Sequence, residues 1–222
     1  MPEPTPQIDH VLVNVNERLD EAAARYRAMG FHLTPRGHHS IGSSNNLAIF
    51  GDDYFELLGY EPHNAGRAAG LWGDASGLSG LVFKTDDAGG LDARLRERGI
   101  ARLSDGPRSL SRPVDLPGGE TRDAGFRTVH LDPATTPSGR IFFCQHLTPD
   151  LVWRREWRDH ANGVTGIAGV TLAAADPAAS IGLIERIFGA DAIRPVDGGM
   201  RLSAGAAFVD YLTPAAARAA FG

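Results

Sequence analysis

The stretch IDHVLVNVNERLDEAAARYRAMGF, residues 8–31, begins a structural unit that the chain uses more than once. Its first part, residues 8–15, is rich in Val, Leu and Ile, which predicts a strand. The residues Leu19, Ala23 and Tyr26 then follow at helical spacing, which predicts a helix with one apolar face. The stretch therefore predicts a strand followed by a helix.

Two further strands complete this first unit. Gly30 is a typical residue just after a helix end, and Gly, Ser and Asn turn signals follow it. Residues 46–50 and 54–60 are then rich in apolar and aromatic residues, which predicts two strands. The first unit thus runs strand, helix, strands.

The same order returns twice along the chain. Residues 78–100, LSGLVFKTDDAGGLDARLRERGI, predict a strand and a helix, and strand-like runs follow at 126–131 and 140–147. Residues 167–190, IAGVTLAAADPAASIGLIERIFGA, repeat the pattern, with short strand-like runs up to Leu212. A repeat of this kind predicts an α+β fold built of βαβββ modules.

The repeat also predicts the domain organisation. We expect the first two modules, residues 7–62 and 77–149, to form one domain over residues 7–150. Residues 151–163 are the expected linker, which we interpret as an ordered strap because its tryptophans can pack on the preceding domain. Residues 164–214 are the expected third module.

Composition excludes several classes of function. The 222 residues carry a formal net charge of −5, which argues against a general affinity for nucleic acid, since that needs a basic face. No apolar stretch approaches the roughly 20 residues of a membrane helix. The start of the chain lacks signal-peptide features, and the single cysteine, Cys144, cannot form an internal disulfide. We therefore expect a cytoplasmic protein, and no nucleotide-binding loop with strict spacing is present.

Glu56 is a carboxylate in the middle of an otherwise apolar strand. Strand alternation places Tyr54, Glu56 and Leu58 on one face, while Phe55 and Leu57 share the other. Both faces are apolar apart from Glu56, so neither looks solvated. A buried carboxylate needs a partner, because an unpaired buried charge is very costly.

The repeated βαβββ unit, with a His on its first strand and a Glu on its last, resembles the vicinal oxygen chelate superfamily. This superfamily includes glyoxalases, extradiol dioxygenases, bleomycin-type resistance proteins and epimerases. The stretches GSSNNLAIFGDDYFELLG (42–59) and FFCQHLTPDLVW (142–153) resemble glyoxalase-like proteins in particular. The resemblance implies that two modules pair into a half-open barrel around a ligand cavity, with the third module added to them.

The resemblance also implies a metal site. In the family pattern, each paired module gives one ligand from its first strand and one from its last, and these hold a divalent ion such as Zn, Ni, Mn or Fe. His10 and Glu56 match this pattern in module one, as metal ligands or as catalytic residues. His10 aligns with Gly80 and Gly169.

On the last strands, Glu56 aligns loosely with Gln145 and Asp210, and a shift of one residue would exchange Gln145 for Cys144 or His146. Module two then lacks the expected His and Glu. A full metal site would need His146, His130 or a group from another chain.

Four further residues are candidates for substrate binding. Gln145 and His130 are predicted to lie on strands of module two and to face the cavity. Arg122 and Arg127 lie in or beside the least regular segment, residues 109–125, which we interpret as a loop on the ligand-facing side. These arginines could hold an anionic substrate.

Two functions remain open at this point. The first is an enzyme. It is either a lyase, isomerase or dioxygenase that acts on a vicinal-oxygen substrate with a divalent metal at His10 and Glu56, or a metal-free enzyme in which these two residues move a proton beside a carbonyl group. The second is a metal-free protein that binds or sequesters a small molecule. The third module leaves one sheet face to be covered, either by the first two modules or by the third module of a second chain, and the latter predicts a homodimer.

Overall fold

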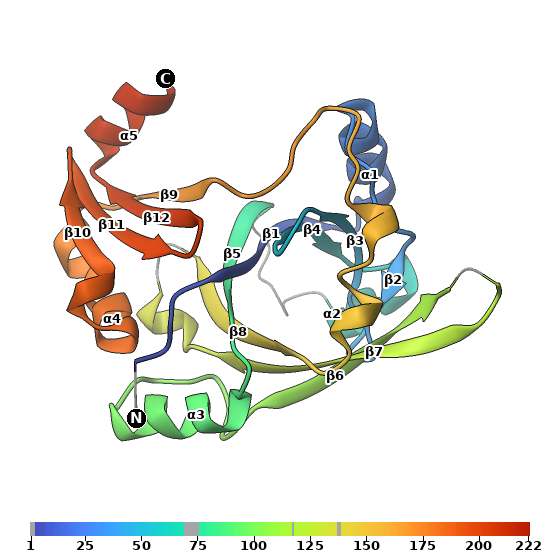
Figure 1. Ribbon diagram of the computed structural model, residues 1–222, viewed down its shortest axis with the longest axis horizontal. Coiled ribbons are helices and arrows are strands. Elements are labelled where there is room, and N and C mark those ends of the chain that lie inside the picture. Colours follow the sequence, from blue (N-terminus) through green and yellow to red (C-terminus); the bar gives the residue numbers. More distant parts are fainter. Residues whose placement is uncertain (1–2, 69–75, 117, 137–138) are drawn as a thin grey trace.

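The computed structural model describes residues 3–68, 76–116, 118–136 and 139–222, and it confirms an α+β fold built of repeated modules (Figure 1). Each module consists of a strand, a helix and three strands. The elements of module one are β1 (Ile8–Asn16), α1 (Leu19–Ala28), β2 (Gly37–His38), β3 (Ser44–Ile49) and β4 (Tyr54–Gly59), followed by the short α2 (Ala65–Ala68). Module two has β5 (Gly77–Lys84), α3 (Ala88–Glu97), β6 (Arg108–Asp115), β7 (Thr121–His130) and β8 (Arg140–His146). Module three has β9 (Gly169–Ala173), α4 (Pro177–Phe188), β10 (Ile193–Val196), β11 (Gly199–Ala204) and β12 (Ala207–Leu212), and α5 (Pro214–Phe221) ends the chain.

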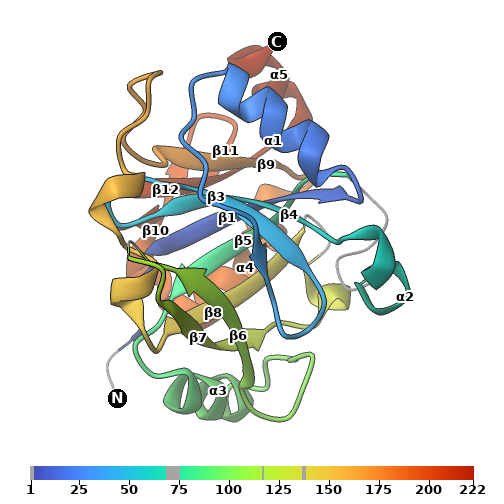
Figure 2. The ribbon, with the colours of Figure 1, turned by 90° about the vertical axis from the view of Figure 1, so that its right-hand side faces the viewer.

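Modules one and two share one curved sheet of eight strands in the order β2-β3-β4-β1-β5-β8-β7-β6. They join where β1 pairs with β5 in antiparallel orientation. The two ends of the sheet curve toward each other (Figure 2). Near β2, the backbone N–H of Ser40 donates to the carbonyl of Ser111 on β6 at 2.9 Å. The sheet is therefore a nearly closed barrel, in agreement with the half-open barrel that the family resemblance implies.

Strand alternation gives this sheet an inner and an outer face. Apolar side chains such as Leu12, Leu58 and Phe142 belong to the core on the inner face. On the outer face, α1 packs on module one through Leu19, while α3 packs on module two through Leu95. The helices therefore stay outside the barrel and leave its interior available for a ligand.

Module three forms its own sheet, with the order β10-β11-β12-β9, and covers the outer face of module two. Phe188 of α4 lies against Phe83 of β5, with ring centroids 4.9 Å apart, and against Phe143 of β8, with centroids 5.9 Å apart. Module three thus shares a core with the barrel. Its otherwise exposed sheet face is covered by the first two modules, which is one of the two alternatives that the sequence left open. Pairing with a second chain stays a prediction.

The segment 109–125, interpreted from the sequence as a loop, is in fact most of a β-hairpin. β6 and β7 pair in antiparallel register from Arg108–Thr128 to Asp115–Thr121, and Pro117 lies outside the described residues. Pro113 argued against a strand in the sequence analysis, because proline is rare in strand interiors. Here it is tolerated, because β6 is the last strand of the sheet and one of its sides has no ladder partner.

The strap that follows module two is ordered and packs on module one. His160 is buried: its Nδ1 accepts from the backbone N–H of His32 at 2.9 Å, and its Nε2 lies 2.9 Å from the carbonyl oxygen of Ile49. Among the described helices, none has the length and apolar character needed to cross a membrane.

Candidate functional site

A cavity of about 380 Å³ occupies the interior of the barrel. Its size is typical of sites that bind small organic molecules. Much of its lining is apolar, with side chains such as Leu47, Leu58 and Phe126. Both modules supply polar side chains to the lining. They are His10, His39, Ser43, Asn45 and Glu56 from module one, and Arg108, Ser109, Arg112, Thr128, His130 and Arg140 from module two.

His10 and Glu56 meet in this cavity. β1 and β4 are parallel, and their register places His10 beside Tyr54 and Leu12 beside Glu56, so that both polar side chains project from one face. His10 Nε2 lies 3.4 Å from Glu56 Oε2. The imidazole also stacks on the ring of Tyr54, with centroids 4.3 Å apart. Both residues are buried, with 3% and 5% of their surface exposed.

Asp9 supports His10 from behind, through a β-bulge. Pairing of β1 with β5 goes from Ile8–Phe83 to His10–Val82, so Asp9 is an extra residue in β1. A bulge disturbs the strict alternation of side chains, and here it lets neighbouring residues contact one another. Asp9 Oδ1 lies 2.6 Å from His10 Nδ1. Because an ionised carboxylate only accepts, Nδ1 carries the proton and Nε2 faces the cavity.

Asp9 is itself fully buried but well supplied with partners. His146 Nε2 lies 3.0 and 3.1 Å from its two carboxylate oxygens, and Lys84 Nζ lies 3.7 Å away. Burial raises the pKa of Asp9, but the charge of His146 and the hydrogen bonds from His10 and His146 outweigh this effect and hold the pKa well below its usual range. Asp9 therefore stays ionised at neutral pH and fixes the orientation of His10.

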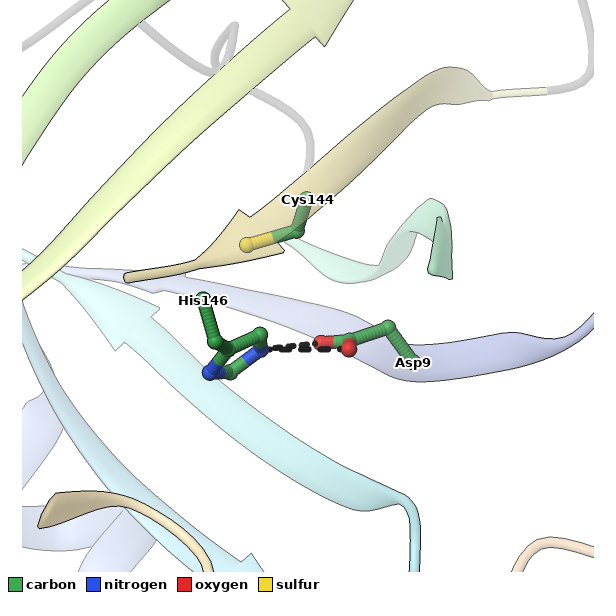
Figure 3. A group of neighbouring side chains, drawn as sticks. All are labelled: Asp9, Cys144 and His146. Atoms are coloured by element: carbon green, nitrogen blue, oxygen red, sulfur yellow. Dashed lines mark hydrogen bonds and ion pairs between the residues drawn. The ribbon is translucent and has the colours of Figure 1, made fainter. Parts of the chain in front are cut away.

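Asp9, Cys144 and His146 form a group whose potential ligand atoms all lie within 4.8 Å of one another (Figure 3). Oxygen, sulfur and nitrogen donors of this kind suit zinc. However, burial raises the pKa of Cys144 well above its usual value, so the thiol keeps its proton. The geometry is that of a His–Asp ion pair beside a thiol, which satisfies Asp9 without an ion.

The environment of Glu56 shifts its protonation. Burial raises the pKa of Glu56, while the nearby His10, the hydrogen bond from Asn45 and the charge of Arg112 oppose this rise. The amide of Asn45 donates to Glu56 Oε1 at 2.6 Å. Glu56 is thus a buried carboxyl whose pKa lies closer to neutral pH than that of an ordinary glutamate, which suits a group that moves protons.

Strand register shows which residues of the other modules correspond to Glu56. In module one, Glu56 lies opposite Leu12, two residues after His10. In module two, the residue two positions after Gly80 is Val82, and it lies opposite Phe142. The alignment with Gln145 is therefore wrong by three residues, because it rested on loosely similar strand ends.

The same rule supports the alignment in module three. Thr171, two residues after Gly169, lies opposite Asp210. Asp210 forms an ion pair with Arg201 at 2.5 Å and lies outside the barrel cavity. Module three therefore keeps a carboxylate at this position for a structural contact.

This register tests the metal site that the family resemblance implies. Module one offers two donors, His10 Nε2 and Glu56 Oε2, whereas module two has Gly80 and Phe142 at the matching positions. Within the described residues, the group of Asp9, Cys144 and His146 is the only set of three potential ligands that lies close enough together, and it does not include Glu56. The residues present do not fit the four-ligand pattern.

Gln145 does not line the cavity, contrary to expectation. Its side chain bonds to the backbone at the start of α3, donating to the carbonyl of Asp86 and accepting from the N–H of Ala88 at 3.2 Å. Alternation instead turns Cys144 toward the cavity and His146 toward Asp9. Cys144 therefore takes the cavity-facing position that was expected for Gln145.

The two arginines predicted to hold a substrate also lie elsewhere. Arg127 is opposite Gln145 on β7 and shares its outward direction, and it is not among the cavity-lining residues. Arg122 is exposed and lies 3.8 Å from Asp150. Neither contributes to the cavity, because Arg127 points to the outer face of the sheet and Arg122 lies at the exposed end of the hairpin.

His130 does line the cavity, where its ring stacks on Phe142 with centroids 4.3 Å apart. Burial lowers the pKa of His130 to about 4, and the charges of Arg108 and Arg140 act in the same direction. The imidazole is therefore neutral at physiological pH and can donate or accept one hydrogen bond on each nitrogen.

Sequence reasoning missed Asp9 and the cavity arginines Arg108, Arg112 and Arg140. No pattern in the sequence indicates the bulge that places Asp9 beside His10. The alternation Arg108, Leu110, Arg112 is visible in the sequence, but only once residues 108–115 are recognised as a strand.

The chain is similar to a known family and to several solved structures. A family model described as a glyoxalase-like domain matches residues 8–188. A solved structure, a hypothetical protein from Staphylococcus aureus, is 15% identical, with a TM-score of 0.71 over 93% of this chain and 86% of the other. A methylmalonyl-CoA epimerase in complex with methylmalonyl-CoA and NH4+ is 20% identical, with a TM-score of 0.45 over 65% of this chain and 96% of the other. The corresponding epimerase of Streptomyces coelicolor, in complex with 2-nitronate-propionyl-CoA, also is 20% identical, with a TM-score of 0.45 and the same coverage.

No curated protein matches the chain in sequence. The family model nevertheless spans most of the chain, from the start of β1 to the end of α4. The chain therefore belongs to the family of proteins with a glyoxalase-like domain.

Proposed function

We propose that the barrel cavity binds a small carbonyl compound and that Glu56 and His10 move a proton at the carbon next to its carbonyl group. The observation that carries this proposal is the contact of 3.4 Å between Glu56 Oε2 and His10 Nε2 at the wall of the cavity. A carboxyl with a raised pKa beside an oriented imidazole is a typical pair for general acid–base catalysis.

Each residue has a definite role in this step. The carboxylate of Glu56 removes the proton, and the electron pair of the broken C–H bond moves onto the carbonyl oxygen to give an enolate. The proton then returns from the Glu56 carboxyl to the same carbon as the carbonyl group re-forms, which regenerates the carboxylate. His10, whose Nδ1–H donates to the ionised Asp9, presents Nε2 to Glu56 and shares the proton with it.

This proposal favours the isomerase among the reaction types that the family resemblance implies. A lyase or dioxygenase that uses Zn, Ni, Mn or Fe at His10 and Glu56 would have only two protein donors, so we assign no step to a metal. Elemental analysis of protein purified without chelator tests this point. If the wild type contains one equivalent of a divalent metal, and both His10→Ala and Glu56→Ala lose it, the result would favour the metal-dependent function instead.

The alternative is a metal-free binding protein that uses the same cavity without turnover. The mostly apolar lining and the volume of about 380 Å³ favour binding in either case. The two functions differ in one respect: only the enzyme exchanges a substrate proton with solvent.

Deuterium exchange measured by NMR separates them. Benzylpyruvate, levulinate and their methyl esters have protons next to a carbonyl group, and we expect at least one of them to exchange faster with the protein in D2O than without it. Glu56→Gln should abolish the acceleration. Glu97→Gln, on the exposed side of α3, is the matched control and should not. Saturable binding without accelerated exchange in the whole panel would favour the binding protein.

A cytoplasmic location and a homodimer formed through module three stay predictions from the sequence. Light scattering at micromolar concentration tests the second, and a clean monomer would count against it.

A further inference from the structure

Arg112 is a buried cation at the wall of the barrel cavity. It lies on β6 with 6% of its surface exposed, and its guanidinium faces the space that also contains Glu56 and Tyr54. Burial lowers the pKa of Arg112, and the electrostatic influence of Tyr54 and Glu56 opposes this shift. Among the described residues, none forms a hydrogen bond with its side chain or lies within ion-pair distance of it.

The other buried charged side chains have close partners. Asp9 contacts His10, His146 and Lys84, and Asp210 contacts Arg201. Asp92 lies 2.8 Å from Arg96 and 2.7 Å from Arg102. Since an unpaired buried charge is very costly, proteins almost always provide a counter-charge or a ligand for it. Arg112 is therefore the buried ion for which the described part of the chain provides no direct partner.

The charge of the whole cavity points the same way. Three arginines, Arg108, Arg112 and Arg140, line it, against the single carboxyl of Glu56. Burial lowers the pKa of His39 to about 3, so this residue, like His130, is neutral at physiological pH. The cavity is thus positive inside a chain whose formal net charge is −5. A concave site lined by one sign of charge concentrates ligands of the opposite sign.

We propose that the substrate is an organic acid and that Arg112 binds its carboxylate. This proposal rests on the proposed function, because it places the reacting carbon of the acid beside Glu56. The planar guanidinium can donate two parallel hydrogen bonds to a carboxylate. The apolar lining, including Leu47, Leu58 and Phe126, then accommodates the rest of the molecule. Neutralising the carboxylate also allows the negatively charged Glu56 to approach, and it stabilises the enolate that forms next to it.

Calorimetric titration with benzylpyruvate and with its uncharged methyl ester tests this assignment. For the wild-type protein we expect the acid to bind about tenfold tighter than the ester, or more, as is typical of a charge-assisted hydrogen bond. Arg112→Met should remove this preference, and Arg112→Lys should retain part of it. Arg122→Met, an exposed arginine of the same hairpin, is the matched control and should leave the preference unchanged.

Thermal unfolding distinguishes a ligand-binding role from a structural one. If Arg112 awaits a ligand, Arg112→Met should unfold at the same temperature as the wild type or higher, since it removes an unpaired buried charge. A lower unfolding temperature of the ligand-free variant would contradict the proposal. Equal affinity of the wild type for acid and ester, or a preference that survives Arg112→Met, would also overturn it. The comparison of acid with ester in the wild type does not depend on whether any variant folds.

Two results separate this proposal from the proposed function. If the acid binds selectively but deuterium exchange is not accelerated, the anion site stands and the proton transfer fails. If the ester exchanges as fast as the acid, the proton transfer stands and the anion site fails. Tighter binding of phenyl phosphate than of benzoate would overturn the carboxylate assignment in favour of a phosphate ester.

Discussion

Modules one and two have the same fold but opposite chemistry at matching positions. Module one has His10 and Glu56 on its first and last strands, and module two has Gly80 and Phe142. Module two instead turns His130, Arg108, Arg112 and Arg140 toward the cavity. In the proposed function, the two halves of the barrel therefore have separate tasks: one provides a proton-transfer pair, and the other provides positive charge and aromatic surface.

Substitution at matching positions should produce the largest difference between the modules. We expect Glu56→Gln to slow deuterium exchange by about 10²–10⁴-fold, as is typical when a general base is lost. Phe142→Leu, at the matching position of module two, should change the rate by less than about tenfold, because it alters only packing. Exchange rates measured by NMR at saturating substrate check both. A larger effect for Phe142→Leu would show that the comparison assigns the chemistry to the wrong half.

Asp9 links the two modules, because it contacts His10 of module one and His146 of module two. Asp9→Asn removes a fully buried carboxylate that two histidines contact, so we expect a loss of about 3–5 kcal/mol in the free energy of unfolding. Urea unfolding measures this value. Asp105→Asn, at a fully exposed side chain, is the control and should leave the free energy of unfolding almost unchanged. Equal effects for the two variants would mean that the Asp9 network does not stabilise the barrel.

Gly80 is more than a missing ligand. A Cβ atom at this position would lie 2.6 Å from Leu12 Cδ1, so a side chain cannot enter without moving Leu12. We expect Gly80→Ala to cost about 1–3 kcal/mol, as is typical of overpacking. Combination with Leu12→Ala should recover part of this loss in a double-mutant cycle. Gly51→Ala has no atom within 4 Å of the new Cβ and is the control. Strict additivity of Gly80→Ala and Leu12→Ala would contradict the steric account.

The smallest expected effect concerns stability as a function of pH, to which His130 of module two and Glu56 of module one should contribute with opposite signs. The pKa of His130 is lowered to about 4 in the folded protein, so folded protein binds fewer protons than unfolded protein, and stability is lost as pH falls from about 6.5 toward 4. The pKa of Glu56 is raised, so its contribution has the other sign: stability is gained as pH falls through its folded pKa toward about 4.3.

Urea unfolding across this pH range checks these signs. As the pH falls, the free energy of unfolding of His130→Gln should decrease less than that of the wild type. Glu56→Gln should be most stabilised relative to the wild type at neutral pH, with the difference shrinking in acid. Parallel pH profiles for both variants and the wild type would contradict the assigned shifts.

Much of the fold could be predicted from the sequence because its signals are local. The strand runs and helical spacings of each module lie within short windows, and their repetition supported the assignment. The closeness of His10 and Glu56, on the first and last strands of one module, came from the family resemblance. The barrel itself came from the family resemblance, since pairing of β1 with β5 joins distant segments.

The rest of the candidate site depends on features that sequence patterns do not contain. The contact of Asp9 with His10 needs a bulge, which only the pairing of β1 with β5 reveals. Arg112 could not be placed in the cavity from the sequence, because Pro113 made its segment, the edge strand β6, resemble a loop. Gln145 was chosen from loose similarity of strand ends, whereas the register that decides the matter is a property of the sheet.

The most direct test of the account is deuterium exchange by protein from which metal ions have been removed with a chelator. Because module two provides Gly80 and Phe142 where further ligands would be needed, we predict that Glu56 and His10 act without an ion. Accelerated exchange should therefore persist in the metal-free protein at the same rate. Loss of exchange on chelation, with recovery on addition of one equivalent of a divalent metal, would contradict this account.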